Sequence, residues 1–168
     1  MVGSCHFLPL AMWQSVWNKH YRSFQSITNV AFIVVTCMDA RIDPIASLGL
    51  KLGDAHVIRN AGGRASEAIR SIVISQRLLG TTEVVLFHHT DCGMLTFSDK
   101  DIKDKLKESE GPAVAPLIDQ IAFLPFSEIE QSIKEDVEFI KSHSLILNDA
   151  KVSGWVHEVE TGKIRQVA

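Results

Sequence analysis

The residues of this chain best suited to metal chemistry form two short groups: Cys37, Asp39 and Arg41 in the first, and His89 and Cys92 in the second. Thiolates and imidazoles are the ligands that zinc prefers. A site with three protein ligands leaves a fourth position for water, which is typical of a catalytic rather than a structural site. We therefore expect Cys37, His89 and Cys92 to bind one zinc ion that activates water.

The number of cysteines argues against a disulfide framework. Cys5, Cys37 and Cys92 make three in a chain of 168 residues, which is long enough to bury a core without covalent cross-links. Cys5 lies near an end of the chain and is interpreted as a bystander. A lone cysteine after an apolar strand is usually a small buried hydrophobic residue. The occurrence of both groups at the ends of predicted strands favours a shared metal instead.

The composition is that of one globular domain without a surface for nucleic acid. Hydrophobic residues make up 46% of the chain and charged residues 22%, and the formal net charge of −3 provides no basic footprint. The longest apolar run, residues 30–35, is far shorter than the ~20 residues of a membrane-spanning helix. We expect neither a nucleic-acid partner nor a membrane segment.

The first 38 residues contain only two charged side chains, Lys19 and Arg22, and no acidic one. Organelle transit peptides are also poor in acidic residues, but they are rich in arginine, and this segment is not. The sequence therefore favours a cytoplasmic protein, with a mitochondrial location as the alternative.

Aromatic residues recur at helical spacing within the same segment, at Trp13, Trp17, Tyr21 and Phe24. This spacing predicts a helix from about residue 10 to 25 with one aromatic face. Such a face is too apolar to leave in water. We expect residues 1–29 to form an N-terminal helical arm that packs on a partner subunit.

Strand-like and helix-like segments alternate after this arm. Apolar runs and periodicity predict, in chain order, a strand at 31–36, a helix at 44–49, a strand at 55–60, a helix at 65–79 and a strand at 83–88. Asp43 and Pro44 are typical of the first two positions of a helix, and Gly49 and Gly80 are typical of helix ends. The core-facing positions of the longer helix are expected to be Ala65, Ala68, Ile69, Ile72, Val73 and Leu79.

The rest of the chain predicts one polar segment, one amphipathic helix and a hairpin. Residues 97–110 are rich in Lys, Asp and Glu and indicate a solvated helix or loop. Ser127 and Glu130 match a capping box at the start of a helix whose inward stripe is Ile129, Ile133, Val137 and Ile140. Residues 152–160 and 163–167, joined by a turn at 161–162, predict an edge hairpin.

This alternation predicts an α/β fold with a mostly parallel sheet flanked by helices. We interpret residues 30–168 as a single zinc-binding catalytic domain that follows the arm. In such sheets ligands bind at the carboxyl ends of the strands. Cys37 follows the first predicted strand and His89 follows the third, so both groups should meet at that edge.

At this point the chain resembles the β-class carbonic anhydrases. The resemblance rests on residues 37–41, 53–63, 89–93, 152–156 and 161–162. It implies an α/β subunit, a homodimer or dimer of dimers, and reversible hydration of carbon dioxide to bicarbonate. It also implies zinc ligands at Cys37, His89 and Cys92. The residues that match Asp39 and Arg41 form a dyad in which the acid contacts the zinc-bound water or, in a closed form, the zinc itself.

The chemistry of the dyad agrees with this resemblance. The carboxylate of Asp39 can accept a hydrogen bond from zinc-bound hydroxide and orient it. Arg41 is always cationic and can pair with the carboxylate bidentately, which holds Asp39 away from the metal. Loss of this pairing should allow Asp39 to take the fourth position, so the dyad would gate the water site.

Two alternatives use the same residues differently. The same zinc site could hydrolyse carbon disulfide or carbonyl sulfide, as some relatives of this fold do. A non-catalytic protein with a structural zinc or a cysteine redox switch is the second alternative, although a structural site gains nothing from a clamped acid beside the ion.

Three further positions bear on the site. His88, a histidine next to a predicted ligand, could serve as a proton shuttle, but strand alternation predicts that it points away from the zinc. One subset of the family has a tryptophan at the position of Val34, where it serves a non-catalytic bicarbonate pocket. That inhibitory pocket is therefore doubtful here, although Arg59 matches one of its partners.

Overall fold

A computed structural model describes residues 30 and 32–168. The predicted aromatic helix at 10–25 and its packing on a partner lie outside the described residues. No described helix is long and apolar enough to span a membrane.

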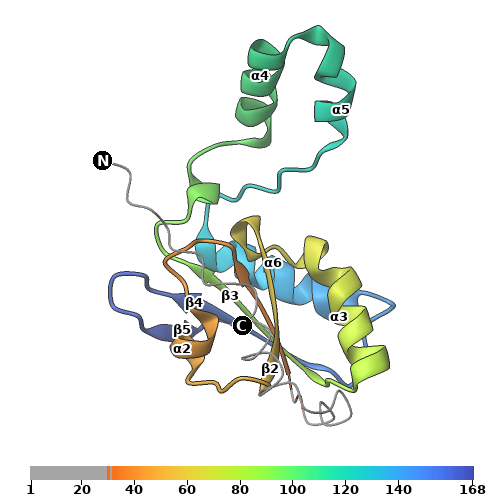
Figure 1. Cartoon of the computed structure of the whole chain (residues 1–168), viewed down its shortest axis with the longest axis vertical. Coiled ribbons are helices and arrows are strands. Elements are labelled where there is room, and N and C mark those ends of the chain that lie inside the picture. Colours follow the sequence, from red (N-terminus) through yellow and green to blue (C-terminus); the bar gives the residue numbers. More distant parts are fainter. Residues whose placement is uncertain (1–29, 31) are drawn as a thin grey trace, which may run out of the picture.

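A five-stranded sheet with the order β2-β1-β3-β4-β5 forms the centre of the molecule (Figure 1). Its strands are β1 (Phe32–Cys37), β2 (Ala55–Asn60), β3 (Glu83–His89), β4 (Lys151–His157) and β5 (Ile164–Gln166). The first four are parallel, and β5 pairs antiparallel with β4. The α/β fold with a mostly parallel sheet is therefore confirmed, and so is the C-terminal hairpin.

The central position of β1 explains its continuous apolar sequence. Val34 faces one side of the sheet while Ile33 and Val35 face the other, and all three are fully buried. Both faces of a strand in the middle of a parallel sheet must be covered, so neither face can be polar. β2 lies at the edge of the sheet and is correspondingly less buried.

The helices are α2 (Pro44–Leu48), α3 (Ala65–Leu79), α4 (Asp99–Glu110), α5 (Ala115–Gln120) and α6 (Ile129–Ser142). α3 and α6 pack against the sheet face that contains Ile33 and Leu86, where they enclose the larger apolar core. Gly154 on β4 allows α6 to approach closely, because an added Cβ would clash with the Cγ2 of Ile133. The smaller core on the opposite face includes Val34, Phe87, Cys37 and Cys92.

The α4–α5 helical hairpin projects from the body of the molecule (Figure 1). α4 has no buried residue, which confirms the predicted solvated segment. Its start is stabilised by a capping box between Ser98 and Asp101. α5 was not predicted from the sequence, because it has six residues and only Ile118 is buried.

Most other predicted elements are confirmed at or near their boundaries, and two details are wrong. α2 begins after the Asp43 cap with Pro44 in its first turn, and it ends at Gly49, which has a left-handed backbone conformation. The Ser127–Glu130 capping box does not form, because α6 begins at Ile129 after Glu128, whose side chain caps nothing. Leu79, expected in the core, is 47% exposed; it is the last residue of α3, next to the Gly80 cap.

Candidate metal centre

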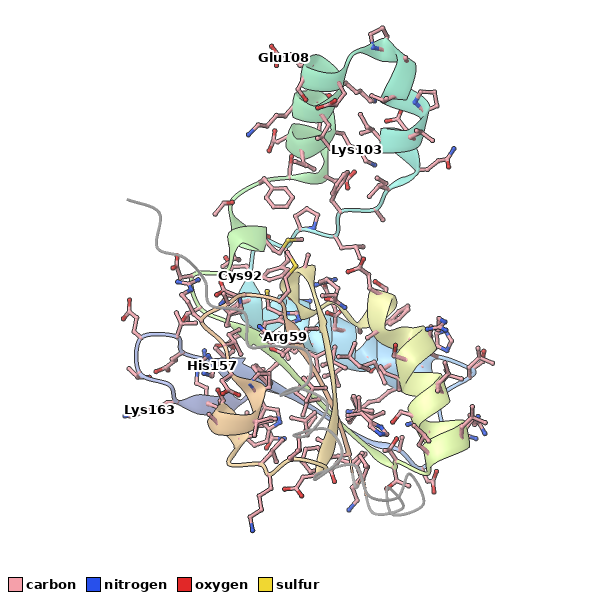
Figure 2. All side chains as sticks on the ribbon, in the orientation of Figure 1. Arg59, Cys92, Lys103, Glu108, His157 and Lys163 are labelled. Carbon is pink, nitrogen blue, oxygen red and sulfur yellow. The ribbon has the colours of Figure 1, made fainter. Side chains whose placement is uncertain are left out.

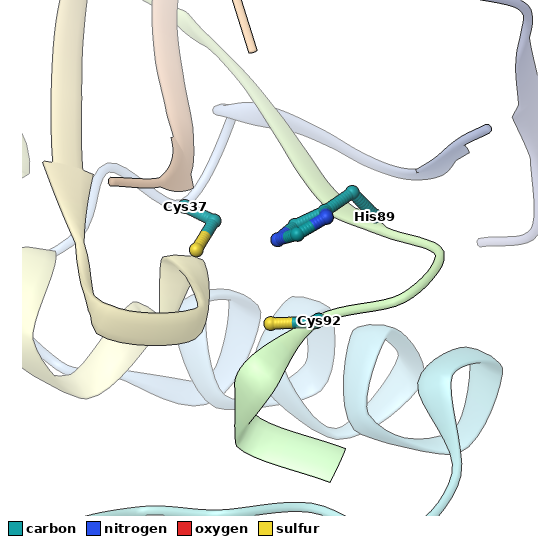
Figure 3. Close-up of side chains that lie close together, drawn as sticks. All are labelled: Cys37, His89 and Cys92. Carbon is teal, nitrogen blue, oxygen red and sulfur yellow. The ribbon is translucent and has the colours of Figure 1, made fainter. Parts of the chain in front are cut away.

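The side chains of Cys37, His89 and Cys92 converge at the carboxyl edge of the sheet (Figure 3). Their ligand atoms all lie within 4.8 Å of one another, and all three residues are buried. Cys37 ends β1 and His89 ends the neighbouring β3, so parallel pairing brings the two together. Cys92 follows β3 after a short turn. The sequence-predicted ligand set is therefore assembled at one point.

A close approach of the β2–α3 connection shapes the floor of this cluster. Gly63 has a φ of +72°, and a Cβ there would lie 2.9 Å from the carbonyl carbon of Thr36 and 3.0 Å from the amide nitrogen of Cys37. The amide of Gly62 donates a hydrogen bond to the Sγ of Cys37 at 3.3 Å. Two adjacent glycines thus bring the backbone against the first thiol, which makes this pair more than a generic turn.

The ring of His89 is oriented for a ligand role. Its Nδ1 lies 2.9 Å from the carbonyl oxygen of Thr90, an acceptor that requires this nitrogen to carry the proton. Nε2 therefore has the free lone pair. It is buried without a hydrogen-bond partner among the described residues, and it faces the two thiols. A buried acceptor without a partner is costly, and a metal ion at this position would satisfy it.

The two thiols influence each other strongly. The hydrogen bond with Cys92 is the main cause that lowers the pKa of Cys37, and His89 and the Gly62 amide act in the same direction against the effect of burial. The same bond, together with burial, raises the pKa of Cys92. Two adjacent thiols and an imidazole with a free Nε2 are donors that zinc binds as thiolates and as a neutral nitrogen, so the donor set fits zinc.

Asp39 and Arg41 form the predicted ion pair beside the cluster. The Nε and Nη2 of Arg41 donate to Oδ1 and Oδ2 of Asp39 at 3.0 and 2.8 Å, and the Arg41 amide donates to Oδ1 at 2.9 Å. These hydrogen bonds hold the pKa of the Asp39 carboxyl well below its usual range. Its Oδ2 lies 3.8 Å from Nε2 of His89, so the clamped acid is next to the ligand atoms.

Arg59 holds the loop that carries this acid. From β2 its Nε donates to the carbonyl oxygen of Cys37 at 3.0 Å, and its Nη2 donates to that of Asp39 at 2.6 Å. The sequence did not indicate this role, because the acceptors are backbone atoms about 20 residues away. Val34, the position considered for an inhibitory pocket, is fully buried in the core.

His88 points to the opposite face of the sheet from His89, as strand alternation predicted. Its Nδ1 lies 2.6 Å from the Oγ of Ser132 and its Nε2 lies 3.3 Å from Oδ2 of Asp136, both on α6. The ring also stacks on Phe126, with centroids 5.1 Å apart. The geometry therefore gives His88 a place in the packing of α6, not in the metal cluster.

A mostly apolar pocket of about 320 Å³ opens onto the cluster. Its lining residues are Cys37, Met38, Asp39, Ala61, Gly62, Cys92, Gly93, Met94, Thr96 and Phe97. Two pockets of about 430 and 450 Å³ lie near the base of the α4–α5 hairpin, whose side chains are drawn in Figure 2. Among the described residues, no metal-ligating cluster lines these two pockets. The pocket of about 320 Å³ combines ligand atoms, a clamped acid and apolar walls.

Fold and site together define a class: an α/β protein with a buried Cys-His-Cys cluster at the carboxyl edge of a parallel sheet. The family model described as "Carbonic anhydrase" matches residues 32–164. β-Carbonic anhydrase 1 of Mycobacterium tuberculosis is 41% identical over 137 residues, which cover 80% of each chain. The chain belongs to the β-carbonic anhydrase family and is an enzyme of that family.

Two further proteins are similar to this chain. The solved structure of a carbonic anhydrase from Glaciozyma antarctica is 47% identical, covers 96% of each chain and superposes with a TM-score of 0.86. A carbon disulfide hydrolase from Acidithiobacillus thiooxidans is 33% identical over 148 residues, which cover 79% of this chain and 74% of the relative. The protein named for carbon disulfide hydrolysis is thus less similar to this chain than the two carbonic anhydrases are.

Proposed function

We propose that this enzyme catalyses the reversible hydration of carbon dioxide to bicarbonate and a proton, with one zinc ion held by Cys37, His89 and Cys92. The observation that carries the proposal is the placement of an ionised, clamped carboxylate 3.8 Å from the free imidazole nitrogen of the cluster. A purely structural metal site has no use for such a group. Membership of the β-carbonic anhydrase family supports the same reaction.

Each of the three proposed ligands offers one donor atom to the metal. His89 offers Nε2 because Nδ1 is committed to Thr90, while Cys37 is already favoured as a thiolate by its hydrogen bonds. When bound, zinc acts as a Lewis acid that lowers the pKa of a coordinated water and so supplies the nucleophile at moderate pH. Two thiolates reduce the effective charge at the site, so this acidification is weaker than with neutral ligands.

Asp39 and Arg41 act as the proposed catalytic dyad. Because Arg41 keeps Asp39 ionised, the carboxylate can only accept hydrogen bonds, and it would orient the attacking oxygen by accepting a hydrogen bond from its O–H group. The same ion pair restrains the carboxylate from reaching the metal. If the pair is broken, we infer that Asp39 becomes an additional metal ligand in a closed form.

The pocket walls suit a small substrate without charge. Ala61, Met94 and Phe97 supply apolar surface next to the ligand atoms, and no lysine or arginine lines the pocket. Carbon dioxide has no strong hydrogen-bonding group, so an apolar wall holds it at little desolvation cost. Asp39 is the acidic residue that lines this pocket, together with the thiols of Cys37 and Cys92.

We also propose that the enzyme is a homodimer or a dimer of dimers. The aromatic spacing in residues 10–25 supports this assembly, because such a face requires a covering surface. β2 adds a second reason, since it is an edge strand and Val57 on it is 38% exposed.

Stopped-flow hydration of carbon dioxide by zinc-quantified protein tests the reaction. We expect turnover well above the uncatalysed rate in the wild type. The Cys92→Ser variant should lose both zinc and activity, because a serine hydroxyl is a poor replacement for a thiolate ligand. Full zinc content in that variant would contradict the ligand assignment.

Hydrolysis of carbon disulfide is the second candidate, favoured by the similarity to a protein named for that reaction. Both substrates are linear and without charge, so the pocket walls described above admit either. The same zinc-quantified preparation should therefore be assayed on both. Turnover of carbon disulfide alone would replace the first proposal with the second.

A further inference from the structure

Asp91, between the two metal-ligating residues of the second motif, contacts the dyad from the other side. Its Oδ2 accepts a hydrogen bond from Nη1 of Arg41 at 2.6 Å, and its backbone carbonyl accepts one from Nη2 at 2.9 Å. We propose that Asp91 is a positioning residue for the reaction: it fixes the guanidinium of Arg41 in the orientation that clamps Asp39. This inference rests on the hydration activity proposed above.

The two acids use different N–H groups of the same guanidinium. The N–H groups of Nε and Nη2 on one edge of the guanidinium donate to the carboxylate of Asp39. On the adjoining edge, Nη1 donates to Oδ2 of Asp91 and Nη2 donates to its carbonyl oxygen. No acceptor displaces another. With both edges occupied, the plane of the guanidinium is determined, whereas either acid alone would leave it free to swing about one edge.

The turn that presents Asp91 is itself anchored. The amide of Thr90 donates to the carbonyl oxygen of His157 at 2.9 Å, and the Oγ1 of Thr90 accepts a hydrogen bond from the amide of Val159 at 3.0 Å. Asp91 has a φ of +54°, in the left-handed region that aspartate, asparagine and glycine adopt more readily than other residues. The acceptor groups for Arg41 are thus fixed to the end of β4.

Two effects of removing Asp91 oppose each other, and geometry decides between them. Loss of a negative charge would strengthen the remaining attraction between Arg41 and Asp39. The side chain of Asp91 is 78% exposed, however, so its charge is largely screened by water. The side chain of Arg41 is 48% exposed and, without the second edge, has room to leave Asp39. We therefore expect a net loss of clamping.

The Asp91→Gly and Asp91→Asn variants separate the side chain from the backbone. Both residues tolerate the left-handed conformation, so the turn should fold normally in each. Glycine removes the Oδ2 acceptor, while asparagine keeps an acceptor without the charge. Asp104→Asn is the matched control, because Asp104 is an exposed aspartate that pairs with Lys100 on α4, outside the site.

Two measurements on the zinc-loaded full chain test the proposal. The first is solvent exchange of the Nε–H of Arg41 by nitrogen-15 NMR, with the signal assigned by its absence in an Arg41→Lys variant. The second is the split between kcat and KM for hydration. The fold-changes follow from the free energy that one exposed ion pair contributes. We expect Asp91→Gly to accelerate this exchange roughly 1.5- to 5-fold and to lower kcat by roughly the same factor, with KM unchanged.

The order of the variants distinguishes positioning from general damage. Asp91→Asn should lie between the wild type and Asp91→Gly in both measurements, and Asp104→Asn should match the wild type. Wild-type exchange and wild-type kcat in Asp91→Gly would overturn the inference. Exchange of the Arg41 proton does not depend on the substrate. An inactive wild type with the expected exchange pattern would therefore remove the proposed function and leave the positioning of Arg41 by Asp91 intact.

Discussion

Replacing Gly63 by alanine should both destabilise the protein and disturb its metal centre. At a φ of +72° an L-residue carries a backbone penalty of about 1–2 kcal/mol. The new Cβ would also lie 2.9 Å from the carbonyl carbon of Thr36 and 3.0 Å from the amide nitrogen of Cys37, both backbone atoms that cannot rotate away. Overpacking of this kind adds about 1–3 kcal/mol. The expected total is about 2–5 kcal/mol.

Gly80→Ala provides the matched control. Gly80 has a φ of +77°, but a Cβ there would meet no atom within 4 Å, so only the backbone penalty applies. In a chain of this size 1 kcal/mol shifts Tm by about 2–4 °C. Calorimetry at one protein concentration should therefore show Gly63→Ala melting below Gly80→Ala, by about 2–12 °C for the additional contact.

Zinc content measured on the same samples links stability to the site. The clash displaces the backbone of Cys37, so Gly63→Ala should retain less zinc than Gly80→Ala, whose site is untouched. Equal Tm values for the two variants, with full zinc in both, would refute the argument that the β2–α3 turn is packed against the first ligand.

Three other predictions concern the dyad, pH and the arm. Arg41→Ala should keep nearly all zinc but lose most hydration activity, with Asp39 on the metal in a crystal structure, whereas Asp39→Ala should keep zinc and lower the rate on the order of 10²–10⁴-fold. Wild-type hydration rates in Arg41→Ala would show that the dyad does not gate the site. Hydration should rise toward alkaline pH as the nucleophile deprotonates. The pKa of Asp39 is lowered in the folded state. The ionised carboxylate therefore stabilises the fold above the unfolded pKa of about 3.9, and this stabilisation is lost only as the pH falls below that value. A carbon-13 titration should accordingly find Asp39 ionised over the whole pH range in which the hydration rate increases. Deleting residues 1–25 should weaken the assembly in light scattering, since each large aromatic side chain contributes roughly 1.5–3 kcal/mol on burial; a full-length monomer would contradict this.

Local sequence patterns determined most of the secondary structure. The continuous apolar run of β1 reflects burial on both faces of the strand. Asp43, Pro44 and Gly49 mark the two ends of α2, because helix caps depend on residues that are adjacent in sequence. Where a pattern was ambiguous locally, the structure differed. Ser127 and Glu130 have the right spacing for a capping box, but α6 begins two residues after Ser127, and only the packing of its stripe on the sheet decides that boundary.

The ligand set was also predictable, for a topological reason. Parallel strands place their carboxyl ends on one edge, so the strand pattern predicted Cys37 and His89 at the same edge of the sheet. The strand order then makes β1 and β3, which end at these residues, direct neighbours. The two-residue alternation of a strand likewise predicted that His88 and His89 point to opposite faces of β3.

The residues that hold the site residues in position could be identified only from the tertiary structure. Arg59 holds the carbonyl oxygens of Cys37 and Asp39 from β2, and Asp91 reaches Arg41 across 50 positions of sequence. Side chain to backbone contacts and non-local ion pairs leave no periodic trace in a sequence, because their partners are chosen by strand order and turn geometry. The sequence alone therefore predicted which residues come together at the site, while the tertiary structure decided how each of them is held.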